Sequence, residues 1–155
     1  MPDVPVLDPA QRAFLGVART ATLATIRPDG LPRLVPICFV VGEDDADGRP
    51  TLSSPLDEKP KASSDPRALA RVRDLLARPE ATLLVDRWSE DWDRLGWIRL
   101  DSRAELVEPG APGHASAIEA LRAKYPQYRE HRLESRPILR FTVERAGAWG
   151  DLDPR

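Results

Sequence analysis

The stretch TATLATIRPDGLPRLVPICFVV, residues 20–41, has the pattern of a β-hairpin. Residues 20–26 are rich in β-branched side chains, and Arg27-Pro28-Asp29-Gly30 then supplies proline, aspartate and glycine where a tight turn requires them. We therefore expect one strand over residues 20–26 and a returning strand over residues 31–41.

The returning strand contains two prolines, Pro32 and Pro36. Because proline has no backbone N–H to donate to a neighbouring strand, we expect this strand to lie at a sheet edge or to contain a bulge. Outside the hairpin, apolar and β-branched patterns predict four further strands, and capping residues with helical apolar spacing predict three helices. The expected strands are 50–54, 81–86, 97–107 and 137–144, and the expected helices are 9–18 after the cap Asp8, 66–78 after the cap Asp65, and 115–124.

The order of these elements is helix, three strands, helix, two strands, helix and strand. Because consecutive strands outnumber alternating βαβ units, we expect a mainly β protein with α (α+β), built as a six-stranded antiparallel barrel with flanking helices. The sequence contains no G-x-G-x-x-G and no G-x-x-x-x-G-K-[ST] motif, which argues against a nucleotide-binding parallel sheet. At 155 residues, the chain 1–155 has the size of a single domain.

The charges nearly balance, since 23 basic and 25 acidic residues give a formal net charge of -2. No whole-chain field therefore favours nucleic acid or an anionic membrane, and any anion site must be local. Cys38 is the single cysteine, which excludes an internal disulfide. The N-terminus lacks a signal-peptide pattern, and no apolar run reaches the roughly twenty residues of a membrane-spanning helix, so we expect a cytoplasmic protein.

Two of the three lysines lie together in the run Asp57-Glu58-Lys59-Pro60-Lys61. Proline favours an extended conformation in the residue before it, and extended residues two apart point the same way, so both ammonium groups are expected to reach one side. Such a pair can surround a phosphate. Ser53 and Ser54 before the run and Arg71 after it are candidate contacts for the same anion. The alternative is a solvated loop in which the two acidic residues of the run neutralise the lysines.

Other catalytic arrangements find little support in the sequence. There is no G-x-S-x-G motif for a serine nucleophile, and neither His114 nor His131 has a histidine or cysteine at the spacing of a zinc site. We expect both histidines to be surface groups. Three tryptophans, Trp88, Trp92 and Trp97, lie close together among acidic residues. Their flat faces can stack on a ring cofactor or anchor a dimer interface, and both roles coincide where a site lies between subunits.

Several segments spread along the chain match one known family. They are Ala21–Thr25, Asp29–Pro32, Val35–Phe39, Asp57–Lys61, Leu83–Asp86, Asp91–Trp92, Trp97–Arg99, Arg103–Ala104, Ala123–Tyr125, Gln127–Tyr128 and Trp149. On these segments, over about residues 10–150, the chain resembles the split-barrel flavin-binding superfamily named after pyridoxamine 5'-phosphate oxidase. The lysine run and the aspartate-tryptophan segment resemble most closely its branch of oxidoreductases that use the deazaflavin coenzyme F420.

The resemblance implies a split-barrel fold and a homodimer, with each cofactor in a groove between the subunits. The residues that it implies for the cofactor phosphate are Ser53, Ser54, Lys59, Lys61 and, less closely, Arg71, and those that it implies beside the groove are Trp92 and Trp97. Many relatives have an asparagine in the helix after the basic segment. The counterpart here is Asp74, which is not expected to bind phosphate because it is an acid.

The implied activity is hydride transfer between F420 and an unidentified small-molecule substrate, with FMN as the alternative cofactor. The cofactor ring performs this chemistry, so no catalytic side chain is nominated. The competing class is a non-enzymatic protein that binds a flavin, a deazaflavin or haem. A haem role would require an axial histidine, and both histidines lie outside the segments that match the cofactor site.

Overall fold

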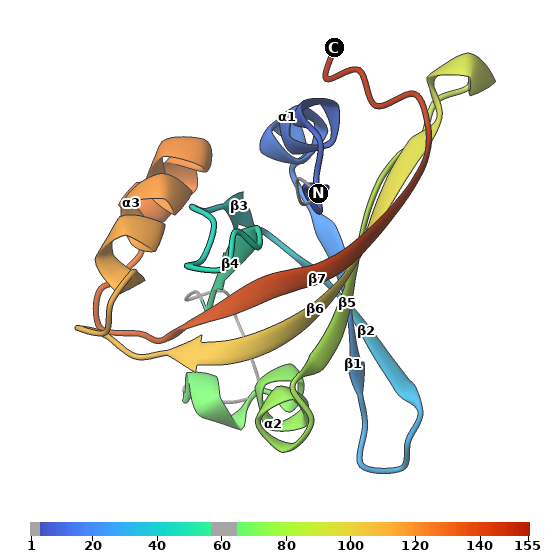
Figure 1. Cartoon of the computed structure of the whole chain (residues 1–155). Coiled ribbons are helices and arrows are strands. Elements are labelled where there is room, and N and C mark those ends of the chain that lie inside the picture. Colours follow the sequence, from blue (N-terminus) through green and yellow to red (C-terminus); the bar gives the residue numbers. More distant parts are fainter. Residues whose placement is uncertain (1–3, 57–64) are drawn as a thin grey trace.

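The computed structural model describes residues 4–56 and 65–155 of the chain. Within these ranges, seven strands form one sheet, flanked by three α-helices and three short 3-10 helices (Figure 1). The strands are β1 (Ala21–Ile26), β2 (Pro32–Ile37), β3 (Val40–Val41), β4 (Thr51–Pro55), β5 (Glu80–Arg87), β6 (Gly96–Val107) and β7 (Ile138–Gly150). The helices are α1 (Pro9–Val17), η1 (Pro66–Ala68), α2 (Ala70–Ala77), η2 (Trp92–Arg94), α3 (His114–Lys124) and η3 (Pro126–Arg129).

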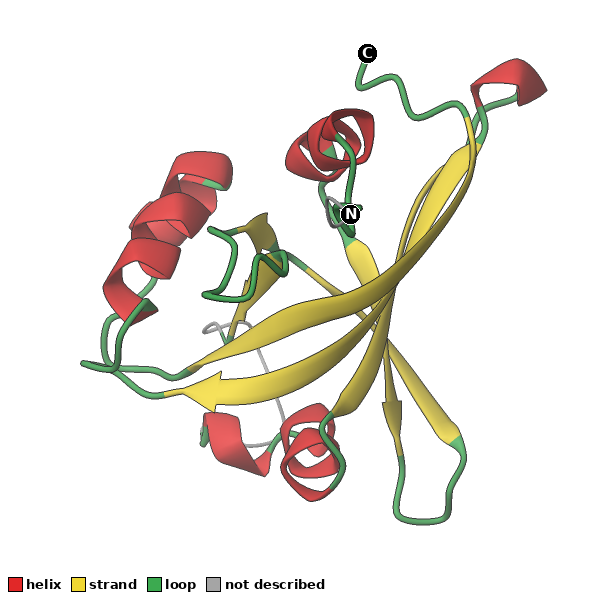
Figure 2. Ribbon diagram, viewed as in Figure 1, coloured by secondary structure: helices red, strands yellow, loops and turns green. Residues whose placement is uncertain are grey.

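The strands follow the order β2-β1-β5-β6-β7-β4-β3 across the sheet, and every neighbouring pair is antiparallel. The long strands β5, β6 and β7 cross the molecule, and the sheet curls along them into an open half-barrel (Figure 2). Side chains alternate between its two faces, and the row Leu23, Leu83 and Leu100 is fully buried on the inner face. The expected antiparallel split barrel of the α+β class is confirmed.

The predicted hairpin forms, with β2 at one edge of the sheet, where its two prolines cost no ladder hydrogen bond on the open side. The predicted single strand over residues 31–41 is wrong, because it divides into β2 and β3. At the break, the Phe39 N–H donates to the Tyr125 hydroxyl over 3.1 Å, and the Cys38 carbonyl accepts from the Ser54 hydroxyl over 2.7 Å. Side chains therefore form hydrogen bonds with the backbone groups that a continuous strand would pair with its neighbour. As a result, the described residues contain seven strands instead of the expected six.

The first helix begins as expected, whereas the second does not. The Asp8 side chain accepts from the Gln11 N–H over 2.8 Å, and the Gln11 side chain accepts from the Asp8 N–H over 2.9 Å, which completes the predicted capping box. Asp65 caps only the short helix η1. Leu69 then adopts an extended conformation and packs against the core, so α2 begins after it at Ala70.

The closing strand β7 is longer than the predicted 137–144 and continues to Gly150, opposite Gly96 of β6. A Cβ atom on Gly96 would overlap the Asp151 carbonyl oxygen, and one on Gly150 would overlap the Leu95 carbonyl oxygen. Gly150 also has a φ of 85°, in the left-handed region. Two glycines therefore allow the chain to cross closely here.

The helix α3 covers a second apolar cluster that includes Leu121, Tyr125 and Tyr128. His114, its first residue, is buried, and its Nε2 atom lies 2.6 Å from the Arg136 carbonyl oxygen. The prediction of a surface His114 is therefore wrong, since this hydrogen bond compensates its burial. No helix in residues 4–56 or 65–155 is long and apolar enough to cross a membrane.

Candidate functional site

The expected phosphate contacts begin in β4, which lies between β3 and β7. Ser53 and Ser54 are both buried there, and the Ser54 hydroxyl already donates to the Cys38 carbonyl oxygen. Lys59 and Lys61 lie outside the described residues. The phosphate-binding role of this segment therefore stays a prediction.

The helix that follows carries Arg71 in its first turn, half-buried, and Asp74 on the side that faces the sheet. Asp74 is only 4% exposed, and its Oδ2 atom accepts from Thr25 Oγ1 and from Arg33 Nε, each over 2.7 Å. Burial acts to raise the pKa of Asp74, but the hydrogen bonds from Arg33 and Thr25 outweigh it and hold the pKa below its ordinary value. The carboxylate thus ties α2 to β1 and β2.

The outer face of the sheet carries an aromatic pair that we call the tryptophan pair, Trp97 and Trp149. These residues lie opposite each other on β6 and β7. Trp149 is 55% exposed, Trp97 is half-buried, and the Arg99 guanidinium lies 5.5 Å from the centre of the Trp97 ring. Two flat aromatic side chains and a cation are therefore available at one end of this face.

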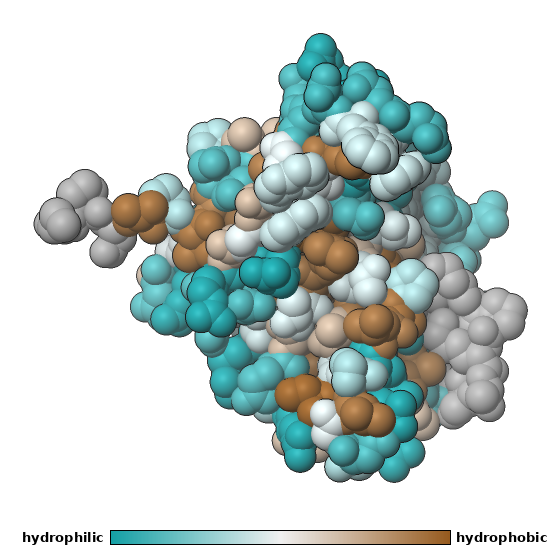
Figure 3. Space-filling model, turned by 90° about the vertical axis from the view of Figure 1, so that its right-hand side faces the viewer, coloured by the Kyte–Doolittle hydropathy of each residue, from teal (hydrophilic) through white to brown (hydrophobic). Residues whose placement is uncertain are grey.

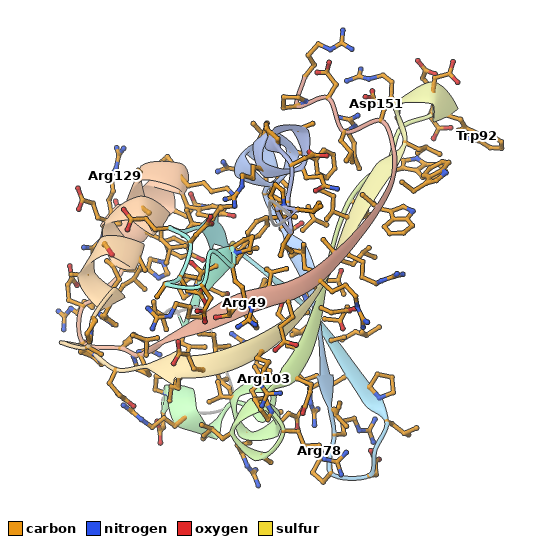
Figure 4. The ribbon with its side chains drawn as sticks, in the orientation of Figure 1. Arg49, Arg78, Trp92, Arg103, Arg129 and Asp151 are labelled. Carbon is orange, nitrogen blue, oxygen red and sulfur yellow. The ribbon has the colours of Figure 1, made fainter. Side chains whose placement is uncertain are left out.

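Trp92 lies apart from this pair, in η2 at the tip of the β5–β6 hairpin, and is 71% exposed (Figure 4). The predicted phosphate and ring contacts are also separated within the chain. Ser54 lies opposite Leu139 near the start of β7, whereas Trp97 lies opposite Trp149 near its end. The structure brings Ser53 and Ser54 together as neighbours, but it does not bring them to either tryptophan.

A groove with a volume of about 380 Å³ opens on the outer face, between these two ends of β7. Asp101 forms part of one wall, where its carboxylate accepts from Thr82 Oγ1 over 3.2 Å and from Arg145 Nε over 3.0 Å. The lining residues are Ala24, Thr25, Ile26, Pro32, Glu80, Ala81, Thr82, Asp101, Ser102, Arg103, Glu144 and Arg145. The volume lies in the range of small-molecule sites, and the lining combines an apolar wall with paired charges.

Another titratable cluster lies away from this groove, where α3 ends against Phe39. The Lys124 ammonium donates to the Phe39 carbonyl oxygen over 2.9 Å and lies 4.1 Å from the centre of the Phe39 ring. Burial, with a smaller contribution from Arg19, lowers the pKa of Lys124 to about 8. In the described part of the chain, no group of three or more His, Cys, Asp or Glu side chains could hold a metal ion.

Sequence reasoning missed Arg99 and Trp149 as members of the candidate site. Trp149 stands in isolation near the end of the chain, and its partner Trp97 is far away in sequence. Their pairing depends on the register of β6 and β7, which shifts at a bulge between Asp101 and Ser102. The available signal in the sequence was the isolated Trp149, which lies just beyond the segment expected to form the last strand.

Comparison with known proteins identifies one family. A family model for pyridoxamine 5'-phosphate oxidase matches residues 7–150. No curated protein sequence matches the chain. Among solved structures, a conserved hypothetical protein of Mycobacterium tuberculosis is 21% identical with a TM-score of 0.66, over 97% of this chain and 89% of that one.

Two further structures illustrate the range of proteins with this fold. HutZ, the haem storage protein of Vibrio cholerae, is 15% identical with a TM-score of 0.63, over 93% of this chain and 94% of that one. An FAD-binding protein of Mesorhizobium loti is 21% identical with a TM-score of 0.55, over 87% of this chain and 86% of that one. At these identities, the likeness concerns the fold.

Proposed function

Because the chain belongs to the pyridoxamine 5'-phosphate oxidase family, we propose that it is a cytoplasmic oxidoreductase that uses the deazaflavin coenzyme F420. Its reaction is hydride transfer to or from an unidentified small molecule, and FMN is the alternative cofactor. The proposal includes a homodimer, in which each cofactor lies between two subunits.

The observation that carries this proposal is the distance along β7 between the two halves of the expected site. Ser54 lies opposite Leu139 and Trp97 lies opposite Trp149, and positions 139 and 149 are ten residues apart. At the rise of a β-strand, this corresponds to roughly 33 Å. That length exceeds the reach from the ring to the phosphate of a flavin mononucleotide. A cofactor that contacts both halves would therefore have to take them from different subunits.

The outer face of the sheet offers the apolar surface that such a dimer needs. Leu34 and Leu84 are exposed there, on the same face as Trp149. Brown apolar patches extend from the middle to the lower end of the side shown in Figure 3. Exposed apolar surface of this kind is typical of interaction sites. Sedimentation equilibrium tests the homodimer directly, and a monomer at tens of micromolar would contradict it.

The tryptophan pair and the lysine run, of which the second lies outside the described residues, supply the two kinds of contact that a deazaflavin or flavin cofactor needs. The tryptophan pair supplies flat faces for a ring, with Arg99 beside them, and the lysine run after β4 supplies positive charge for a phosphate. When bound, the cofactor supplies the carbon that accepts or donates the hydride. The tasks left to the protein are to hold the phosphate, to orient the ring and to keep water from it.

The preference for F420 over FMN rests on the lysine run and the Asp91-Trp92 segment, which carry the resemblance to the F420-using branch. Fluorescence titration of Trp97→Ala with F420 tests the ring site. Loss of one stacking partner is worth about 0.5–1.5 kcal/mol, so affinity should fall roughly 2- to 12-fold. Val17→Ala, which truncates an exposed side chain at the end of α1, serves as the control. Unchanged affinity in folded Trp97→Ala would reject the ring site.

A haem-binding protein is the second candidate, because one similar structure is that of a haem storage protein. The structure gives this reading less support, since the Nε2 atom of His114 is already hydrogen-bonded to the Arg136 carbonyl oxygen. Haem titration followed by Soret absorbance separates the two. Tight haem binding that is lost in His131→Ala, with no binding of F420, would favour the haem reading.

A further inference from the structure

Two opposite ends of the molecule differ in charge. At one end, the acidic tip (residues 88–93) carries exposed Glu90, Asp91 and Asp93 beside the exposed Trp88 and Trp92. In the described part of the chain, the neighbouring arginines form no ion pair with these three carboxylates and instead face the C-terminal segment. Arg87 donates to the carbonyl oxygens of Asp151 and Asp153, and Arg94 donates to that of Arg155.

The opposite end carries positive charge on α2 and at the residue that follows it. Arg73 and Arg78, which we call the basic end, are both exposed. In residues 4–56 and 65–155, neither of them forms an ion pair with an acid. Leu76 on the same helix is 62% exposed. Figure 1 shows α2 at the lower end of the molecule and the tip of the β5–β6 hairpin at the upper right, and Figure 4 places Trp92 and Arg78 at these two ends.

We propose that two copies of the chain pair in opposite orientation, so that the acidic tip of each lies against the basic end of the other. The inference rests on the homodimer of the proposed function and adds its orientation and its electrostatic contact. A twofold-symmetric pair makes every contact twice, so one tip-to-helix contact implies a second. Pairing in the same orientation would instead bring the carboxylates of both tips together and the arginines of both helices together, which is repulsive.

The apolar side chains at the two ends agree with this arrangement. Trp88 and Trp92 are large, exposed and amphipathic, which is typical of residues that anchor an interface. The exposed Leu76 lies between Arg73 and Arg78 in the sequence, near the end of α2, and offers the tryptophans of the other copy an apolar surface. The exposed tryptophans would then be covered in the pair while the charges around them are matched.

Two charge-reversed variants test the contact. Glu90→Arg with Asp93→Arg makes the tip basic, and Arg73→Glu with Arg78→Glu makes the basic end acidic. Asp91 is left unchanged because its side chain accepts from the Asp93 N–H and caps η2. Each double variant now repels its own copy at both contacts, so its self-association, measured by sedimentation equilibrium at low salt, should weaken at least about tenfold.

Mixing the two double variants should restore association, because each tip then meets a helix of opposite charge. Native mass spectrometry should show the mixed pair in excess over either self-pair, and a chain with all four changes should again pair with itself. This rescue separates a lost contact from a misfolded variant. The excess should fall at 0.5 M salt, where exposed charges are screened.

Three results would overturn the inference. If the wild-type chain is monomeric, the homodimer fails together with the inference. If both double variants remain dimers of wild-type affinity, the homodimer stands and the proposed orientation fails. If both associate weakly but the mixture and the four-change chain do not recover, the charges act elsewhere, for example on a basic peptide of another protein at the tip.

Discussion

Replacement of Asp74 by alanine should destabilise the fold more than any change to an exposed carboxylate. The wild-type carboxylate is 4% exposed and accepts from Thr25 Oγ1 and Arg33 Nε, so α2, β1 and β2 meet at this one side chain. Alanine removes the acceptor for both donors. It leaves the Thr25 hydroxyl, which is 1% exposed, buried without this partner.

The magnitude follows from the burial of the two donors. A buried hydroxyl left without its partner costs about 1–3 kcal/mol. The Arg33 side chain is 34% exposed and can recover water, so loss of its ion pair adds about 1 kcal/mol. The sum of about 2–4 kcal/mol corresponds to a fall in Tm of roughly 5–15 °C for a chain of this size.

Urea unfolding followed by circular dichroism measures this loss, with Asp44→Ala as the matched control. Asp44 also pairs with an arginine, Arg12, but both side chains are more than a third exposed, so its loss should cost less than about 1 kcal/mol. Because the folded pKa of Asp74 lies below its ordinary value of 3.8, its contribution is complete above that value and is lost as pH falls through the folded pKa. Equal losses in the two variants at pH 7 would refute the reasoning.

Three further predictions concern other parts of the chain. Changing Lys59 and Lys61 together to alanine should weaken F420 binding by about 1.5–3 kcal/mol per charged hydrogen bond with an unchanged Tm, and unchanged affinity would reject the phosphate site. Lys124 has a folded pKa of about 8 against 10.5 when unfolded, so the unfolded chain binds more protons between these two values. The free energy of unfolding of the wild type should therefore rise relative to that of Lys124→Met from pH 8 to 10. Urea midpoints that run parallel for the two proteins over this range would contradict the prediction. Gly150→Ala should lower the free energy of unfolding by well over 1 kcal/mol, and by more than Gly48→Ala does. Both glycines have positive φ, but only a Cβ at Gly150 would meet backbone atoms. Equal losses of stability in thermal unfolding would argue against the close crossing of the chain at Gly150.

The features that the sequence predicted correctly are local ones. The turn at 27–30 and the capping box of Asp8 and Gln11 each depend on residues within a few positions, and both form as expected. The break between β2 and β3 could not be predicted in this way. It depends on the Tyr125 hydroxyl, which is 86 positions from Phe39 in the sequence.

The candidate site was only partly predictable for the same reason. Trp97 could be singled out within its own segment, but its partner Trp149 and the separation from Ser54 follow from the register of β7 with two different strands. Likewise, Asp65 and Pro66 form a good local helix start, yet the core contact of Leu69 ends that helix after one turn. Tertiary packing, which has no local signature, determined these outcomes.

The central claim, that this chain is an F420-using member of its family, is tested most directly by its affinities for two cofactors. The purified apo-protein would be titrated with F420 and, separately, with FMN, and fluorescence would be followed at physiological ionic strength. The account predicts micromolar or tighter binding of F420 and binding of FMN that is weaker by at least about tenfold. Tighter binding of FMN, or binding of neither cofactor, would contradict it.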